Sequence, residues 1–447
     1  MSFTSISSRR CWRRLKITAV LSRRIGSGTC LNMAETPSRK VAKGIDSIVI
    51  TGGIKGANVE PTTAEVTRNA FMMAGCCSAF AGVCNQHGGP FGATVTKDNQ
   101  IVSCMHNTVL QDENPTRHGE MNAIRQACAN LRSADLSGCD MYTTCEPCPM
   151  CWGAIQRSGI RDMYIGVDRY LAAEFSFSDK AYYDEIALLH NALNSKEQAQ
   201  PVVSNFLTVR VGNPLKALVQ DQLLGGDSTT SGDGGDSAWL TVLQADTTQD
   251  GSPQAKRSPS IADQRISAEQ HAEFSEQLVS YAREMIAKHG SGAQPDGHEA
   301  CILVDTQTGG VVGRGSALTA GHEDASGGFV TAAVEQATSE VFKTQFLTEC
   351  IAYCTVEPDP MNFCSLLWAK VPFLYIGLPQ GDVDAYRNRT PGSQDGERTH
   401  RIFEKFFERE ERKKQEQPGA VDRVVLRDEC ADLFRLFENV GGFGQLF

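Results

Sequence analysis

Two short segments of the sequence combine residues that could bind a metal ion with a residue that could move a proton. His118 and Glu120 lie two positions apart in "PTRHGEMNAIRQAC", and Cys148 and Cys151 lie three apart in "TTCEPCPMCWGAI". Imidazole nitrogen and thiolate sulfur are ligands that zinc prefers. Residues three apart share one side of a helix, so the two sulfurs can face one ion. The pattern predicts that His118, Cys148 and Cys151 bind one zinc ion.

Three protein ligands are typical of a catalytic zinc site. A structural site is normally closed by four protein ligands, whereas a catalytic site keeps one position for water. Zinc lowers the pKa of such a water toward roughly 7. Glu120 beside the metal could take the proton of the water and pass it to a ring nitrogen and then to a leaving amine. These roles predict hydrolytic deamination of an amino-substituted heterocycle.

Each of these residues also has a simpler interpretation when it is taken alone. Cys148 and Cys151 could belong to a structural zinc site with Cys145 as a fourth ligand, or could be two buried thiols. His118 could be a hydrogen-bonded histidine of the core. A structural site has no use for the acid Glu120, however, and the whole set H-x-E…P-C-x-x-C is the signature of zinc-dependent deaminases.

The surrounding sequence predicts the elements that position these residues. Residues 61–84 are expected to form an amphipathic helix, and "FGATVTKDNQIVSC" alternates around Asp98-Asn99 as in a β-hairpin. A helix that carries His118 should begin near Asn114 and Pro115. The segments "MYTT" and "MYIGV" read as strands with a helix between them that begins after Pro147. This order predicts a βαβ unit with neighbouring parallel strands.

The second half of the chain repeats the first. "TVEPDPMNFCSLLWAKVPFLYIG" (355–377) aligns without a gap on "TCEPCPMCWGAIQRSGIRDMYIG" (144–166). A helix over 267–289 and the strands "CILVDT" and "GVVGRGSAL" also repeat the order of the first half. The sequence therefore predicts a duplicated fold.

The repeat has lost the residues with metal and acid–base chemistry. Asp359 and Asn362 align with Cys148 and Cys151. In the segment "TAAVEQATSEV", Ala332 and Val334 are expected at the positions that correspond to His118 and Glu120. An Asp and an Asn are poor replacements for soft thiolate ligands. The second half is therefore predicted to keep a deaminase-like fold without zinc.

These motifs resemble the cytidine-deaminase-like superfamily and, within it, the bacterial guanine deaminases and the plant guanosine deaminases. The resemblance covers about residues 62–190 and is carried by "HGGPFGATV", "DENPTRHGEMNAIRQAC", "CEPCPMCWGAI" and "AAEFSFSDK". It implies an α/β fold, namely a three-layer α/β/α sandwich around a mixed five-stranded sheet, here duplicated. It also implies one zinc ion per chain, in the first domain, with Glu120 as the catalytic residue.

The resemblance further implies how a purine is held. Asn107 should hydrogen-bond the purine, Phe91 and Phe177 should pack near it, and Asp179 should receive the exocyclic 2-amino group of guanine. A buried carboxylate that faces an N–H pair discriminates against a base that leaves it unpaired. The expected reaction is deamination of guanine or guanosine to xanthine or xanthosine plus ammonia. The simpler interpretations are that Asn107 ends a strand, the phenylalanines belong to the core, and Asp179 caps a helix.

Two other functions stay open at this point. One is adenosine-to-inosine deamination in transfer RNA, with the second half as an inactive partner domain. Active subunits of that kind carry basic surfaces, whereas the run "EREERKKQEQ" (408–417) mixes both charges and is interpreted as a solvated helix face. The other is a zinc-stabilised binding protein without activity, against which Glu120 argues.

The resemblance also bears on assembly. Members of the superfamily work as dimers or larger assemblies in which a neighbour completes the pocket. Residues 265–447 are therefore expected to pack on the first half as a built-in partner, and a homodimer of the whole chain stays open. The alternative is an independent domain on a loose linker.

Composition sets the outer limits of the protein. The chain has 447 residues with 41% hydrophobic and 21% charged residues, as in ordinary globular proteins. Its net charge of −10 argues against a protein built to bind nucleic-acid backbones, and no apolar run is long enough to span a membrane.

Four segments are expected along the chain. They are a basic leader (1–45), a catalytic zinc deaminase domain (46–222), a flexible acidic Gly/Ser linker (223–264) and a degenerate deaminase-like domain (265–447). The first 34 residues contain Arg and Lys but no Asp or Glu, as organelle transit peptides do. The alternatives are an unstructured basic tail, or untranslated sequence ahead of a start at Met33. The protein is therefore expected in the cytoplasm, or in mitochondria or plastids if residues 1–34 act as a transit peptide.

Overall fold

The computed structural model describes most of the chain outside its N-terminal segment. The described residues are 62–194, 203–204, 206–211, 215–223, 240–247, 253–255, 265–289, 298–320, 324–387, 397–415 and 423–439. The basic leader predicted for residues 1–45 lies outside them. No helix within the described residues has both the length and the apolar character needed to cross a membrane.

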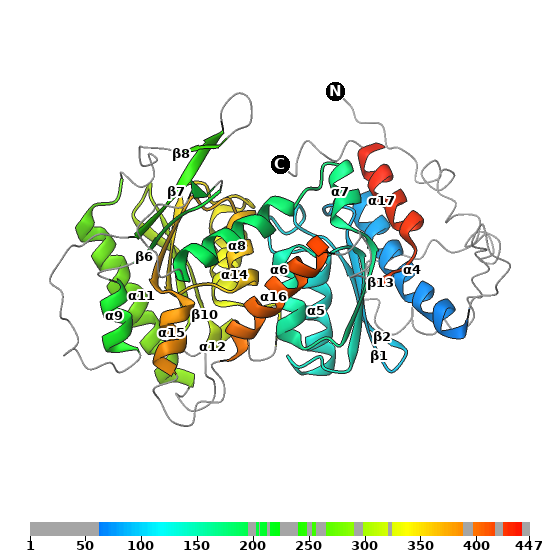
Figure 1. The fold of residues 1–447 in the computed structure, drawn as a ribbon, viewed down its shortest axis with the longest axis horizontal. Coiled ribbons are helices and arrows are strands. Elements are labelled where there is room, and N and C mark those ends of the chain that lie inside the picture. Colours follow the sequence, from blue (N-terminus) through cyan, green and yellow to red (C-terminus); the bar gives the residue numbers. More distant parts are fainter. Residues whose placement is uncertain are drawn as a thin grey trace.

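The first half folds around a mixed five-stranded sheet. The strand order is β13-β4-β3-β1-β2, in which β1 runs antiparallel to β2 and β3, whereas β3, β4 and β13 are mutually parallel. Helices α4 and α17 cover one face, and α5 and α6 cover the other (Figure 1). The elements are α4 (Thr63–Cys84), β1 (Gly92–Lys97), β2 (Gln100–His106), α5 (Gly119–Leu131), β3 (Cys139–Cys145), α6 (Pro149–Ser158), β4 (Asp162–Val167), α7 (Arg169–Glu174), β13 (Arg423–Val424) and α17 (Arg427–Asn439).

The second sheet repeats this arrangement. Its strands β10, β9, β11, β12 and β6 follow in the same order and with the same directions as β2, β1, β3, β4 and β13. The elements are β6 (Thr208–Val211), α9 (Leu215–Gln222), α11 (Ala268–His289), β9 (Ala300–Asp305), β10 (Gly310–Ser316), α12 (Ala317–Ala320), α13 (Phe329–Glu335), the π-helix η2 (Gln336–Phe342), β11 (Cys350–Val356), α14 (Pro360–Trp368), β12 (Phe373–Leu378) and α15 (Gln380–Arg387). The prediction of a duplicated α/β fold around mixed sheets is confirmed.

Most local expectations for the first half agree with the structure. The helix predicted over 61–84 is α4, and β1 and β2 form the predicted hairpin. Asp98 and Asn99 both adopt positive φ at its turn, which these residue types tolerate better than most. Strands β3 and β4 are parallel, with α6 between them, as the βαβ prediction requires.

The two halves exchange the strands that complete their sheets. β13 follows the second half in sequence but pairs with β4 of the first sheet, so that Arg423 lies opposite Tyr164. β6 follows the first half but pairs with β12 of the second sheet, so that Arg210 lies opposite Tyr375. The exchange is reciprocal, because each arginine also donates a hydrogen bond to the hydroxyl of its tyrosine.

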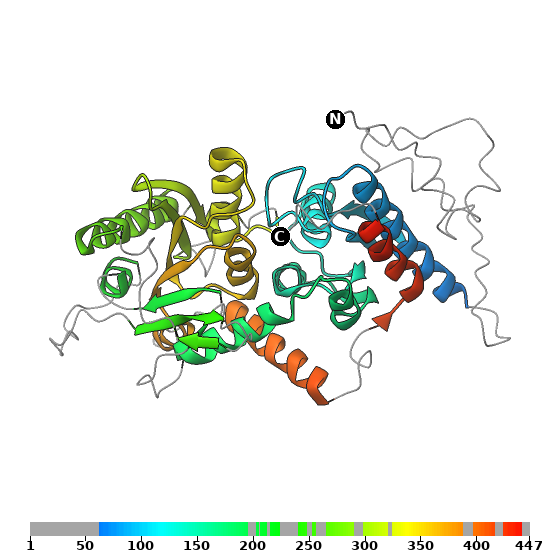
Figure 2. The same ribbon diagram turned by 90° about the horizontal axis from the view of Figure 1, so that it is seen from above.

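This exchange differs from the domain boundaries expected from the sequence, which assign residues up to 222 to the first half and 265–447 to the second. Helix α17 follows β13 onto the first sheet, where it lies beside α4 in both views (Figures 1 and 2). Helix α9 follows β6 onto the second sheet. Strand patterns in a sequence do not specify which of two similar sheet edges a strand will join, so the exchange was not predicted.

Two helices cross between the halves together with these strands. Helix α8 (Lys180–Asn194) of the first half packs on α14, and α16 (Glu397–Gln415) of the second half packs on α6. Each of these two helices is hydrogen-bonded to the glutamate of a Glu-Pro dipeptide in the other half. Glu357 accepts hydrogen bonds from His190 at 2.7 Å and from Asn194 at 2.9 Å, both on α8.

Glu146 holds α16 in the corresponding way. It accepts hydrogen bonds from Arg409 at 2.7 Å and Lys413 at 2.6 Å, and also pairs with Arg169. The three cations outweigh burial and hold the pKa of Glu146 well below its usual range. Interpreting the run 408–417 as a solvated helix face is therefore wrong for Arg409 and Lys413, whose side chains are buried.

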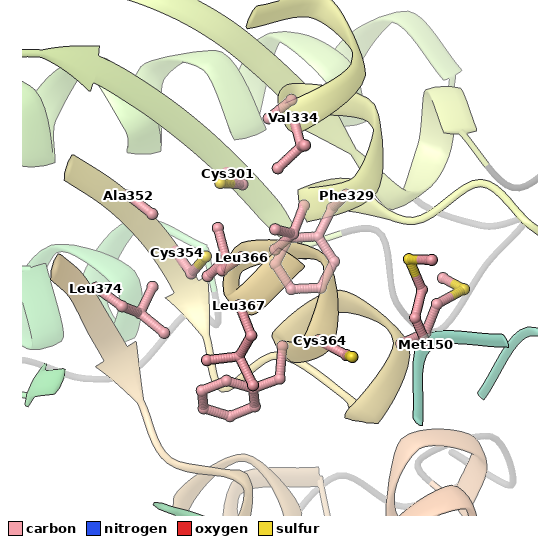
Figure 3. Packing of buried hydrophobic residues seen from close by; sticks show 14 of the residues in the cluster. Met150, Cys301, Phe329, Val334, Ala352, Cys354, Cys364, Leu366, Leu367 and Leu374 are labelled. Carbon is pink, nitrogen blue, oxygen red and sulfur yellow. The ribbon is translucent and has the colours of Figure 1, made fainter. Parts of the chain in front are cut away.

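Helices α6 and α14 meet at the centre of the molecule. A Cβ atom added at Gly153 on α6 would lie 2.8 Å from the backbone nitrogen of Met361 on α14, so only glycine allows this approach. Figure 3 shows Met150 of α6 facing the part of α14 that carries Cys364. One continuous cluster of buried apolar residues joins the halves here, so they do not pack as independent tethered domains.

The segment expected to be a flexible linker contains two strands. β7 (Leu240–Thr247) pairs with β6 and β5 (Val203–Ser204), and β8 (Pro253–Ala255) pairs with β7. The average composition of 223–264 is rich in Gly, Ser and Asp, and it hides the stretch "WLTVLQAD", whose apolar residues favour a strand.

Candidate active site

The three predicted metal ligands converge at the N-terminal ends of two helices. His118 is the residue before α5, and Cys148 is the residue before α6, with Pro149 at the first helical position. The helix therefore begins at Pro149 and not directly after Pro147, and α5 begins at Gly119 rather than near Asn114. Among the described residues, His118, Cys148 and Cys151 are the only group of such side chains whose ligand atoms lie close enough to hold a metal ion.

The spacing of these atoms fits zinc. Nδ1 of His118 lies 3.5 Å from each cysteine sulfur, and the two sulfurs lie 3.7 Å apart. A tetrahedral zinc with ordinary bond lengths would need about 3.6 Å and about 3.8 Å for these spacings. With one imidazole and two thiols, the donor chemistry also suits zinc.

The surroundings favour the ionised form of one ligand. Burial opposes ionisation of Cys148, but hydrogen bonds from Cys151 and Cys364 and the charge of His118 lower its pKa well below the usual value of a thiol. Cys148 also precedes a helix, whose N-terminal end favours negative charge. Cys364 belongs to α14, so the second half touches the metal site.

Glu120 lies in the first turn of α5 and faces the metal site. It is only 4% exposed, and its Oε1 accepts a hydrogen bond from the hydroxyl of Thr143 at 2.8 Å. Burial and the neighbouring Cys148 raise the pKa of Glu120. The residue thus combines a fixed position with the proton affinity that a proton-transfer group needs.

A pocket opens beside these residues and is lined by all four residues predicted to contact substrate: Phe91, Asn107, Phe177 and Asp179. The Oδ1 of Asn107 accepts hydrogen bonds from the backbone N–H groups of Gly89 and Val109. A side chain at Gly88 would collide with this Oδ1. Asn107 is thereby held with an amide group that makes no hydrogen bond to any described residue, so its two N–H donors are available.

Asp179 lies just before α8 and lines the same pocket. Its Oδ1 is buried and has no hydrogen-bond partner among the described residues. Burial raises the pKa of Asp179 to about 8, and the charge of Cys148 acts in the same direction. A buried oxygen without a partner is costly, so the site is suited to a ligand that donates a hydrogen bond.

Phe91 and Phe177 meet edge-to-face with ring centroids 5.0 Å apart. Phe434 of the exchanged helix α17 contacts both rings, at 5.4 and 5.5 Å. Both interpretations of Phe91 and Phe177 therefore hold, because the two side chains line the pocket and also pack against an apolar cluster.

The second half supplies a part of the pocket wall that the sequence did not predict. Gln345, Phe346, Trp368 and Lys370 all line the pocket. Lys370 lies over the ring of Phe346, 4.4 Å from its centroid. Spacing could not reveal these residues, because they are more than 150 positions from the motifs of the first half. The internal repeat was the only signal available.

The corresponding place in the second half is closed by its own side chains. Asp359 precedes α14 with the same backbone angles as Cys148 before α6, and accepts hydrogen bonds from both nitrogens of Asn362. Asn362 in turn accepts from the backbone of Val330 at 3.0 Å. The other carboxylate oxygen of Asp359 binds Arg157 of the first half at 3.0 Å.

The structure corrects the alignment of the preceding helix. Helix α13 begins at Phe329, with Gly328 in the position of His118, so Val330 corresponds to Glu120. Ala332 and Val334 lie one turn further on. The helical repeat allows a shift of about one turn without changing which face is apolar, which explains the error. Gly328 and Val330 therefore supply neither the imidazole nor the acid that His118 and Glu120 supply in the first half.

Comparison with known proteins identifies the family. The family model named cytidine and deoxycytidylate deaminase zinc-binding region matches residues 66–167 of the sequence. The guanine deaminase of Bacillus subtilis is 39% identical over 121 residues, which cover 27% of this chain and 78% of that relative. The chain belongs to the cytidine and deoxycytidylate deaminase family.

Other members of the family are also similar to this chain. A tRNA-specific adenosine deaminase of Aquifex aeolicus is 45% identical over 71 residues. These residues cover 16% of this chain and 47% of that relative, so the chain spans about half the length of the relative. The solved structure of the Bacillus subtilis guanine deaminase has 40% identity and a TM-score of 0.26, covering 26% of this chain and 74% of that one. Family membership indicates a zinc-dependent deaminase, and the group formed by His118, Cys148 and Cys151 is consistent with one zinc ion.

Proposed function

We propose that the protein deaminates guanine or guanosine by hydrolysis, giving xanthine or xanthosine plus ammonia. The observation that carries the proposal is the unpaired Oδ1 of Asp179 in the pocket beside the metal ligands. A 2-aminopurine with an N–H at position 1 presents adjacent donors to such an acceptor, whereas adenine has no N–H group on this edge. The 39% identity with a guanine deaminase supports the same substrate class.

The chain's own residues divide the chemistry between them. His118, Cys148 and Cys151 would hold zinc, which would act as a Lewis acid and make water easier to deprotonate. Glu120 would accept a proton from the attacking water and donate it to a ring nitrogen, and would then transfer the proton of the new hydroxyl group to the amine, so that the C–N bond breaks and ammonia leaves. The Thr143 hydroxyl keeps the Glu120 carboxylate in place.

The remaining pocket residues orient the base. Asp179 accepts a hydrogen bond from its N–H groups, and the free amide of Asn107 donates to an acceptor on the ring. Phe91 and Phe177 provide an apolar wall against which a planar base can pack. Orientation matters, because the amine must lie within reach of Glu120 for the proton transfer to occur.

Ammonia release from a set of substrates tests the proposal. Guanine, guanosine, adenine, cytosine, cytidine and transfer RNA would be incubated with the zinc-loaded full chain. We expect release from guanine or guanosine and little from the others. Activity restricted to adenosine in transfer RNA would contradict the guanine assignment and favour adenosine deamination in transfer RNA, the activity named for the Aquifex aeolicus relative.

Substitution at Asp179 tests the recognition step. Asp179→Asn should lower kcat/KM for the preferred 2-aminopurine by about 10- to 100-fold, the effect of leaving a buried hydrogen-bonding group of the substrate without its partner. Zinc content should not change. Asp184→Asn is the matched control, because Asp184 is an exposed residue of α8, the helix that follows Asp179, and pairs with Lys180. Equal losses in both variants would refute a specific role for Asp179.

A further inference from the structure

A second residue of the pocket wall has a buried polar atom without a partner, and it comes from the second half. The indole N–H of Trp368 makes no hydrogen bond with any described residue. Among the described residues, Trp368 and Asp179 are the two that line the pocket and have such an unpaired buried atom. One offers a donor and the other an acceptor. Leaving either buried without a partner is unfavourable, so both point to a ligand with complementary groups.

Trp368 is held in place beside the metal ligands. It is the last residue of α14, and its ring meets His118 edge-to-face with centroids 4.9 Å apart. Tyr182 also meets the indole edge-to-face, with centroids 4.8 Å apart and the ring planes at 83°. These two ring contacts restrict the indole, so little side-chain entropy remains to be lost when a ligand binds.

We propose that the indole N–H of Trp368 donates a hydrogen bond to the substrate, so that the second half contributes a specificity-determining residue to the active site of the first. The inference rests on the proposed function, since it concerns the same pocket. The partner would be an acceptor on a purine that also donates to Asp179. Guanine meets both conditions, because it carries N–H donors together with a 6-oxo oxygen and unprotonated ring nitrogens.

This role gives the inert half a chemical reason to keep its fold. Its own site is closed by Asp359 and Asn362, so it can act only on the pocket of the first half. Helix α14 is fixed against α6 by the close contact at Gly153, and Trp368 lies at the end of that helix. The position of the indole therefore depends on packing between the halves.

A donor role and a packing role predict different results for two variants. Trp368→Phe keeps an aromatic ring and removes the N–H, whereas Trp368→Leu removes both. If the N–H binds substrate, Trp368→Phe should lower kcat/KM for guanine by about tenfold, as expected for one hydrogen bond left unmade. Zinc content and thermal midpoint should stay at wild-type values. Tyr281→Phe serves as the control, since it removes one polar group from the second half away from the pocket.

Substrate analogues then identify the acceptor. 2-Aminopurine lacks the 6-oxo oxygen, and 3-deazaguanine and 7-deazaguanine each lack one ring nitrogen. The analogues are compared as competitive inhibitors of guanine deamination, because one of them lacks a ring nitrogen that the reaction could need. For the analogue without the partner atom, wild type and Trp368→Phe should have equal inhibition constants, while the tenfold difference persists for the others. A packing role would instead give similar losses with every substrate, and would spare Trp368→Phe relative to Trp368→Leu.

The failure of this inference can be distinguished from failure of the proposed function. If wild type converts guanine and Trp368→Phe does so equally well, the donor role is overturned while the function stands. If wild type converts none of the purines, the function fails. Titration calorimetry with guanine then measures the indole contact directly, and equal affinity of wild type and Trp368→Phe, or no binding to either, overturns it.

Discussion

At the scale of single residues, the proposal makes Glu120 responsible for proton transfer and not for metal binding. Glu120→Gln keeps the size of the side chain and can still accept the Thr143 hydrogen bond. It cannot carry a proton, so kcat should fall by a factor of about 10²–10⁴ or more. Zinc content, measured after dialysis against a weak chelator, should remain at one ion per chain.

Changes to the ligands should behave differently. Cys148→Ser and His118→Ala should lose zinc and activity together, because three protein ligands leave no reserve. Glu113→Gln is the control, since Glu113 is exposed and lies outside the pocket. Near-normal turnover by Glu120→Gln would refute the proton-transfer role.

The sequence predicted those site residues whose relations are local. Cys148 and Cys151 share one helix start, and the resemblance to a known family supplied Asn107 and Asp179. Cys148, Asn107 and Asp179 line the pocket, and Cys151 lies behind it, 3.7 Å from Cys148 between the two sulfurs. Trp368 could not be found in this way, because its relation to His118 depends on how two helices distant in sequence pack against each other.

At the scale of elements, the exchanged helices depend on the buried glutamates of the Glu-Pro dipeptides. Glu357→Gln should destabilise the full chain, because a neutral amide would replace the buried carboxylate that contacts His190 and accepts hydrogen bonds from Asn194 and the backbone of Gln380. The expected cost is about 2–3 kcal/mol of unfolding free energy. Urea denaturation of the zinc-loaded protein would measure it.

Asp382→Asn is the matched control for this prediction. Asp382 of α15 pairs with Lys216 of α9, so this ion pair also joins a first-half helix to the second half, but both side chains are well exposed, at 45% and 38%. An exposed ion pair contributes little, so the change should stay within about 0.5 kcal/mol. Equal stability of both variants would show that Glu357 does not anchor α8.

The elements themselves were largely predictable, whereas their partners were not. Alternation identified the β1–β2 hairpin, and periodicity identified α4 and α11. Sequence alternation and periodicity cannot assign β6 or β13 to a sheet, because the two short strands are alike. Each has an arginine that lies opposite a tyrosine of the strand that it joins. Only the complete fold shows that each crosses to the other half.

At the scale of the whole molecule, the exchange makes each half depend on the other. Helix α17 buries Cys430, Leu433 and Phe434 against the apolar face of α4. Each large apolar side chain contributes about 1.5–3 kcal/mol when it is buried. Together they represent a large share of the 5–15 kcal/mol that typically stabilises a domain. A first half without residues 423–439 should therefore expose that face of α4 and lose its fifth strand.

Dividing the chain tests this dependence directly. A fragment of residues 35–260, expressed alone, should self-associate or aggregate and should lose most deaminase activity, because it lacks α17 and Trp368. Co-expression with residues 261–447 should restore a one-to-one complex, one zinc ion and the activity of the intact chain, since the break lies outside the described strands and helices. Size-exclusion chromatography with light scattering and an ammonia assay would measure both. If the lone fragment is monomeric and as active as the full chain, the second half is not a working part of the enzyme.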